Sequence, residues 1–320
     1  MMEYTGEIAA VATAMCWAFT SQFFSLSGRR ISSPTVNKMR ILFALFILSG
    51  IHFVLYGNFF PTEITWYQFS NLALSGFIGF VIGDAVLFEA FVLIGARISM
   101  LIMSLVPIIG AVIAFFVFDE RLTYLKVFGI AVTLVGILWV LLARDTNGVN
   151  SNRKKYILGI LLALGGAICQ AVGMIFAKEG MFADGAANLD VAPISGTLIR
   201  AIIGVAGLWF YVLIRGRVFS EFRKLKDLKA SFYLALGTFF GPVLGVTLSL
   251  AAVKYAHVAV AATLMVLAPV FLIPIVYFIY KEKISWSAIF GTIVAVGGAA
   301  ILILSDEIQP IIDTLVAYVQ

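Results

Sequence analysis

An aspartate stands in the middle of the apolar stretch GFIGFVIGDAVLFEAF, where Asp84 is followed five residues later by Glu89. An ionisable side chain inside hydrocarbon costs at least ~2.5–3.5 kcal/mol, so it requires an ionic partner, water or a function. Asp84 is a candidate to bind a cationic group or a coupling proton, and Glu89 is a second candidate for the proton. The structural alternative is an ion pair or hydrogen bond that only holds the helix in place.

Two arginines, Arg40 and Arg200, lie within apolar stretches at matching places in the two halves of the chain, 160 residues apart. A functional pair of arginines would hold an anionic group, such as a carboxylate, from either face of the membrane. The alternative is that both long side chains reach the membrane surface and anchor their helices there. The sequence leaves both interpretations open.

A set of weakly polar residues lies in the first apolar stretch, VATAMCWAFTSQFF. Thr13, Trp17, Thr20 and Ser21 follow the helical spacing i, i+4, i+7 and i+8, so they form one mildly polar face. The corresponding segment of the second half of the chain contains Gln170.

The composition around these residues is that of a membrane protein. Of 320 residues, 62% are hydrophobic and 12% are charged, about half the charged fraction of a soluble domain. Apolar runs of about 20 residues, long enough to cross ~30 Å of hydrocarbon as helices, recur throughout. The two cysteines and two histidines are scattered, so no disulfide framework, metal site or other cofactor is expected. The sequence therefore predicts an all-α integral membrane protein.

Breaks at charge and turn clusters divide the chain into ten candidate spans joined by short connections. Their approximate ranges are 5–26, 35–56, 67–93, 97–118, 124–143, 156–177, 192–214, 230–253, 258–280 and 285–305. With ten spans, 17 of the 22 basic residues fall on one side of the membrane. Basic loops remain in the cytoplasm, so both termini are predicted to be extracytoplasmic. The basic loop 215–229 is interpreted as a topology signal that contacts anionic lipid headgroups.

The two halves of the chain repeat each other. FVFDERLTYLKVFG, which ends at Gly129, reappears 162 residues later within YFIYKEKISWSAIFG, which ends at Gly291. Pro107 and Pro269 are related by the same offset, and each favours a kink at the same place in its span, either as a gate or as a static bend. Each copy has five predicted spans, and an odd number predicts repeats of inverted orientation.

These repeated residues resemble the EamA-type halves of the drug/metabolite transporter superfamily. The pattern is a proline, about twelve apolar residues, a Glu-Arg/Lys-Leu/Ile-Ser/Thr turn, and two glycines seven residues apart. Its members in the first half are Pro107, Glu120, Arg121, Leu122, Thr123, Gly129 and Gly136. Its members in the second half are Pro269, Glu282, Lys283, Ile284, Ser285, Gly291 and Gly298. The resemblance predicts one EamA-like repeat at 1–145 and a second at 156–306. The closing stretch at 307–320 is too short to span the membrane and is expected to lie at its interface.

The resemblance implies a secondary transporter, and the absence of a P-loop motif argues against direct use of ATP. It places the first and sixth spans around a central cavity, which makes Trp17, Thr20, Ser21 and Gln170 candidates for the cavity wall. In small multidrug relatives an acid in the middle of the first span carries the coupling proton. Here the acid of that span is Glu7, near its start, which argues against that route.

The expected function is export of a small metabolite or amino acid across the cell (inner) membrane by alternating access. The expected partners are the substrate, membrane lipids and a coupling proton; the sequence offers no support for nucleic-acid binding. One alternative is a flippase for lipids or lipid-linked sugars. The other is an intramembrane lipid-modifying enzyme, but the chain lacks the clustered His, Asp or Cys residues that such chemistry uses.

Overall fold

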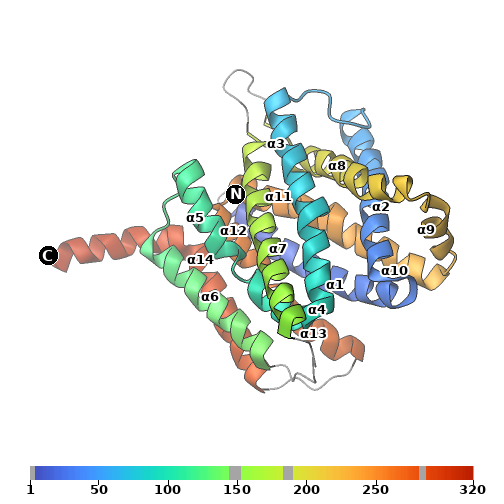
Figure 1. The fold of residues 1–320 in the computed structure, drawn as a ribbon. Coiled ribbons are helices and arrows are strands. Elements are labelled where there is room, and N and C mark those ends of the chain that lie inside the picture. Colours follow the sequence, from blue (N-terminus) through green and yellow to red (C-terminus); the bar gives the residue numbers. More distant parts are fainter. Residues whose placement is uncertain (1–3, 144–152, 183–189, 281–285, 320) are drawn as a thin grey trace.

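The structure is a computed structural model that describes residues 4–143, 153–182, 190–280 and 286–319. These residues form helices joined by short connections, with no strand among them (Figure 1). The first repeat contains α1 (Thr5–Ile31), α2 (Ser33–Tyr56), α3 (Trp66–Gly76), η1 (Phe77–Gly83), α4 (Asp84–Met103), α5 (Val106–Phe118) and α6 (Tyr124–Ala143). The second contains α7 (Arg153–Glu179), α8 (Pro193–Ile214), α9 (Val218–Lys224), α10 (Leu228–Thr238), η2 (Phe239–Gly245), α11 (Val246–Tyr255), α12 (Val258–Met265), α13 (Ala268–Tyr280) and α14 (Trp286–Val319).

The described helices match a multi-pass membrane protein. Seven helical segments are long and apolar enough to cross a bilayer. Three further apolar helices are shorter, at Val106–Phe118, Tyr124–Trp139 and Val258–Leu272. The all-α prediction is confirmed for the described residues, whereas the count of ten spans stays a prediction.

The third and fourth predicted spans meet at a different place from the one expected. Instead of a break near Gly95, the chain is helical from α3 through η1 to the end of α4 at Met103. The break falls just before Pro107, and a matching break after Met265 precedes Pro269. A proline ring clashes with the carbonyl four residues earlier, which in both repeats is the last residue of the preceding helix. Each expected kink is therefore a full helix break, whereas a lone glycine does not end a helix.

Repeat-related helices α2 and α8 run antiparallel to each other. Near the start of α2, the carbonyl of Lys38 accepts a hydrogen bond from Trp209 Nε1 at 3.3 Å. Near its end, His52 Nε2 lies 3.1 Å from Ser195 Oγ, which is close to the start of α8. An antiparallel arrangement is what inverted repeats require.

Helices α6 and α14 form a second antiparallel pair, side by side at the lower left of Figure 1. A Cβ atom on Gly129 would lie 3.2 Å from the carbonyl oxygen of Gly298, and one on Gly136 would lie 2.7 Å from that of Gly291. Adding 162 to Gly129 gives Gly291, and subtracting 162 from Gly298 gives Gly136, so the two contacts are related by the repeat. Such reciprocity indicates a pseudo-twofold axis between the two helices. The four motif glycines thus allow two repeat-related backbones to cross closely.

The repeats are also interlocked, because the first helix of each packs against the third predicted span of the other. Helix α1 lies along α10, η2 and α11, where Thr20 approaches Gly241. Helix α7 lies along α3, η1 and α4, where Cys169 approaches Gly83. Helix α14 continues to Val319, and its end projects away from the bundle (Figure 1). The interfacial placement of the 307–320 segment stays a prediction.

Gly298→Ala is expected to lower the free energy of unfolding by roughly 1–3 kcal/mol, the usual cost of overpacking. A Cβ at Gly298 would lie 2.4 Å from the backbone nitrogen of Thr133, whereas one at the adjacent Gly297 would meet nothing within 4 Å. Gly297→Ala is the matched control and should keep or slightly raise stability. SDS titration of the purified protein in mixed micelles measures both variants. Equal stability of the two would contradict the close crossing.

Candidate functional site

Asp84 forms an ion pair with Arg40 inside the bundle. It is the first residue of α4, directly after η1, and its Oδ2 accepts a hydrogen bond from Arg40 Nη2. Arg40 Nε also donates to Asn37 Oδ1 at 2.9 Å, and its guanidinium lies 5.6 Å from the ring centroid of Phe24. The side chains of Arg40 and Asp84 are only 13% and 22% exposed. The ion pair of the structural interpretation therefore exists, but a second cation shares its acid.

Arg200 is that second cation, and it is buried rather than extended to the membrane surface. The residue is 7% exposed, and its guanidinium lies 5.0 Å from the ring centroid of Phe80. It is close enough to Asp84 to interact electrostatically with the same carboxylate. Its Nε is buried and has no hydrogen-bond partner among the described residues. The interpretation of Arg200 as a surface anchor is therefore wrong.

Two glycines make room for Arg200. A Cβ on Gly76 would lie 2.7 Å from the Cα of Arg200, and one on Gly79 would lie 3.1 Å from its Nη2. Any larger residue at Gly76 would push α8 away, because the contact involves backbone on both sides. The small residues before Asp84 thus allow the helices to approach closely.

The segment before Asp84 is π-helical, which the sequence analysis missed. η1 (FIGFVIG) and η2 (FFGPVLG) each span seven residues and are related by the offset of 162. Such wide turns are rare and are frequently found at functional sites. The repeats differ at the next position, because Val246 stands where the first repeat has Asp84. One acid therefore faces two repeat-related arginines, and one positive charge is left over.

The candidate wall residues Trp17 and Thr20 pack against η2. A Cβ on Gly245 would lie 3.0 Å from the Trp17 ring, and one on Gly241 would lie 2.7 Å from the Thr20 methyl group. Thr20 Oγ1 donates to its own helix, at the carbonyl of Cys16. Trp17 and Thr20 of α1 therefore pack against the π-helical segment of the second repeat, just as α7 packs against that of the first.

The other candidates lie apart from the contacts that join Asp84 to the arginines. Ser21 is exposed and its hydroxyl donates to the carbonyl of Ala18, while Gln170 is half-buried on α7. Glu89 is exposed on α4. Their roles in a cavity wall or in coupling stay predictions, as do gating roles for Pro107 and Pro269.

A buried carboxylate, Glu120, joins the first repeat to the second. Its Oε1 accepts a hydrogen bond from Lys178 Nζ at 2.6 Å, and its Oε2 accepts one from the Val258 N–H at 2.9 Å. His257 Nδ1 lies 3.5 Å from the same Oε2. Burial would raise the pKa of Glu120, but the contacts with His257, Lys178 and Val258 outweigh it and lower the pKa to about 2. We call these four residues the Glu120 clasp.

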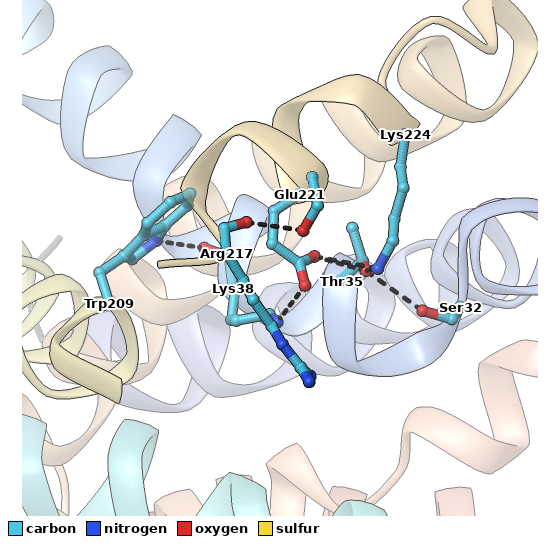
Figure 2. A network of polar contacts seen from close by, with 8 residues as sticks. Ser32, Thr35, Lys38, Trp209, Arg217, Glu221 and Lys224 are labelled. Atoms are coloured by element: carbon cyan, nitrogen blue, oxygen red, sulfur yellow. Dashed lines mark hydrogen bonds and ion pairs between the residues drawn. The ribbon is translucent and has the colours of Figure 1, made fainter. Parts of the chain in front are cut away.

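A second buried carboxylate, Glu221 of α9, joins the repeats in the reverse sense (Figure 2). It accepts hydrogen bonds from Lys38 Nζ at 2.8 Å, Thr35 Oγ1 at 2.7 Å and Lys224 Nζ at 3.2 Å. Burial would raise the pKa of Glu221, but the hydrogen bonds from Lys38 and Thr35 lower it overall. We call these four residues the Glu221 clasp. Lys224 therefore binds a protein carboxylate and is not merely a lipid contact.

The two clasps lie at opposite ends of the bundle. Thr35 and Lys38 belong to the start of α2. The end of α2 leads to the start of α3, which packs against Gly180, two residues beyond Lys178.

Sequence reasoning missed both clasps. The repeated glutamate of the DERLT and KEKIS turns was the available signal for Glu120; its counterpart Glu282 lies outside the described residues.

An all-helical bundle of two antiparallel, interlocked repeats is an architecture found in many membrane transporters. Comparison with known families agrees. The model of the EamA-like transporter family matches residues 4–142 and 157–304, so the chain belongs to this family.

The fold is also found among solved structures. One crystal structure superposes with a TM-score of 0.68, covering 93% of this chain and 96% of the solved chain. The two sequences are 18% identical, so the likeness concerns the fold alone. A comparison with curated protein sequences returned no match.

Glu120→Gln is expected to lower the free energy of unfolding at pH 7 by about 3 kcal/mol, because Lys178 loses its buried counter-ion. The pKa of Glu120 is lowered from 4.5 to about 2, so its stabilising contribution is present above pH 4.5 and is lost as the pH falls toward 2. The gap between wild type and variant should therefore shrink below pH 4.5.

The matched control is Asp119→Asn, which removes the neighbouring carboxylate from an exposed ion pair with Arg121. This change is expected to cost less than about 1 kcal/mol. SDS titrations at pH 7, 5 and 3 measure both variants. A Glu120→Gln cost as small as that of the control, or one independent of pH, would rule out the ionic clasp.

Proposed function

We propose that this protein is a secondary active exporter of a small metabolite or amino acid that works by alternating access. The observation that carries the proposal is the reciprocal packing of α6 against α14, in which contacts are exchanged by the repeat offset. Two antiparallel units of similar sequence have two nearly equivalent packings, each open to one side of the membrane. The Arg40–Asp84–Arg200 centre lies between those units and is the proposed substrate site.

The two clasps fit the role of gates. Each joins a carboxylate of one repeat to a lysine of the other, so each has to open when its side of the bundle opens. Both clasps are formed in the described structure, so both of the proposed gates are shut in it. The helix breaks before Pro107 and Pro269 supply equivalent bending points in the two repeats.

The proposed energy source is an ion gradient, with protons as the coupling ion. Asp84 is the proposed proton-binding group, because protonation would release Arg40 and change the charge of the centre. Asp84→Asn mimics the protonated form permanently, so the variant should bind substrate without cycling.

Proteoliposomes with an imposed pH gradient and a panel of labelled amino acids and small organic acids provide the test. Asp84→Asn is expected to lower the transport rate at least tenfold while the protein elutes as one monodisperse species. Glu63→Gln, which removes an exposed carboxylate from the loop between α2 and α3, is expected to transport at the wild-type rate. Unchanged transport by Asp84→Asn would exclude its coupling role. Movement of labelled lipids without movement of any soluble compound would instead establish the flippase.

The proposed orientation places both termini outside the cytoplasm of an inner-membrane protein. It is supported by the basic residues around α9 and by the excess of such residues on that side. In a variant lacking Cys16 and Cys169, Lys226→Cys is expected to be protected from a membrane-impermeant thiol reagent in intact cells. Glu63→Cys, in the loop between α2 and α3, is expected to react. The reverse labelling pattern would invert the topology.

A further inference from the structure

The charges of the central site are unequally satisfied. Asp84 is hydrogen-bonded to Arg40, and Arg40 is also held by Asn37. Arg200 has no carboxylate in hydrogen-bonding contact among the described residues, and its Nε is buried without a partner. A buried cation with an unused donor is costly, because the site has removed it from water without replacing the lost hydrogen bonds. The structure therefore contains an unmet requirement for an acceptor at Arg200.

The residues around Arg200 do not supply this hydrogen-bond acceptor, so a ligand has to supply it. One side of its guanidinium lies against the Phe80 ring, and the neighbouring backbone is that of Gly79, which has no side chain to contribute. In the first repeat the acid after η1, Asp84, is hydrogen-bonded to Arg40, and the second repeat has Val246 at the equivalent position. The two π-helical segments and the residues that follow them therefore supply one carboxylate, which contacts Arg40, and no second one for Arg200.

We propose that Arg200 binds an anionic group of the transported molecule and that this group is a carboxylate. The inference rests on the proposed transport function and specifies its substrate class as small monocarboxylates. Two arginines and one aspartate leave one positive charge, which a monoanion neutralises and a doubly charged phosphate would reverse. A guanidinium also presents parallel N–H groups at the spacing of two carboxylate oxygens.

The direct test is ligand binding to the purified protein in detergent at constant ionic strength. Acetate, lactate and benzoate are titrated by calorimetry, each beside its neutral amide. The carboxylates are expected to bind and the amides are not. Arg200→Gln is expected to weaken carboxylate binding 10- to 100-fold, the range for a lost charge-assisted hydrogen bond. Arg215→Gln, which removes an exposed arginine after α8, should bind like wild type.

A second variant keeps the proposal testable if Arg200→Gln does not fold. Asp84→Asn removes the acid that competes for the arginines, so carboxylate binding is expected to stay or to tighten several-fold. Loss of carboxylate binding in this variant, or binding of amines by the wild type that Asp84→Asn abolishes, would overturn the proposal. Equal binding of carboxylates and amides would also overturn it.

The outcome also separates this inference from the proposed function. If proteoliposomes transport a neutral or cationic compound and Arg200→Gln leaves its apparent affinity unchanged, the exporter stands and the carboxylate site is wrong. If carboxylates bind through Arg200 but no compound crosses the membrane, the site stands and the exporter is wrong.

Discussion

Charge inside a bilayer requires an opposite charge or a hydrogen-bond partner, and this constraint organises the centre of the molecule. Arg40 and Arg200 occupy corresponding places in α2 and α8, and both act on the single carboxylate of Asp84. Gly76 and Gly79 are required because the guanidinium and backbone of Arg200 occupy the space where side chains would otherwise lie. Because the second repeat has no acid at the position equivalent to Asp84, the site between the two similar repeats carries a net charge.

The pseudo-symmetry of the remainder supports the proposal that this site opens to each side of the membrane in turn. Helices α6 and α14 cross at reciprocal glycine contacts, while α1 and α7 each pack against the opposite repeat. The carboxylates Glu120 and Glu221 tie the repeats together at opposite ends, and each takes its main cation from the other repeat. In the proposed transport cycle, a relative movement of the repeats opens one end and preserves the other.

The sequence was sufficient for the membrane class, the repeat and the candidates Arg40, Asp84 and Arg200, because these follow from composition, a constant offset and the cost of charge in hydrocarbon. It was insufficient for the burial of Arg200, since a side chain eight residues into a helix can either reach the surface or turn inward. The π-helices were missed because one wide turn leaves the apolar pattern unchanged. The clasps were missed because Glu120 and its partner Lys178 are 58 residues apart along the chain.

The central claim is that the two ends of the bundle open alternately, and paired distance measurements by pulsed electron spin resonance test it most directly. One pair of labels, at Arg121 and Tyr255, spans the Glu120 end, and another, at Arg29 and Phe219, spans the Glu221 end; all four positions are exposed. Weakening the Glu120 clasp by Glu120→Gln is predicted to lengthen the first distance while the second stays short. Lengthening of both distances together, or of neither, would contradict the account.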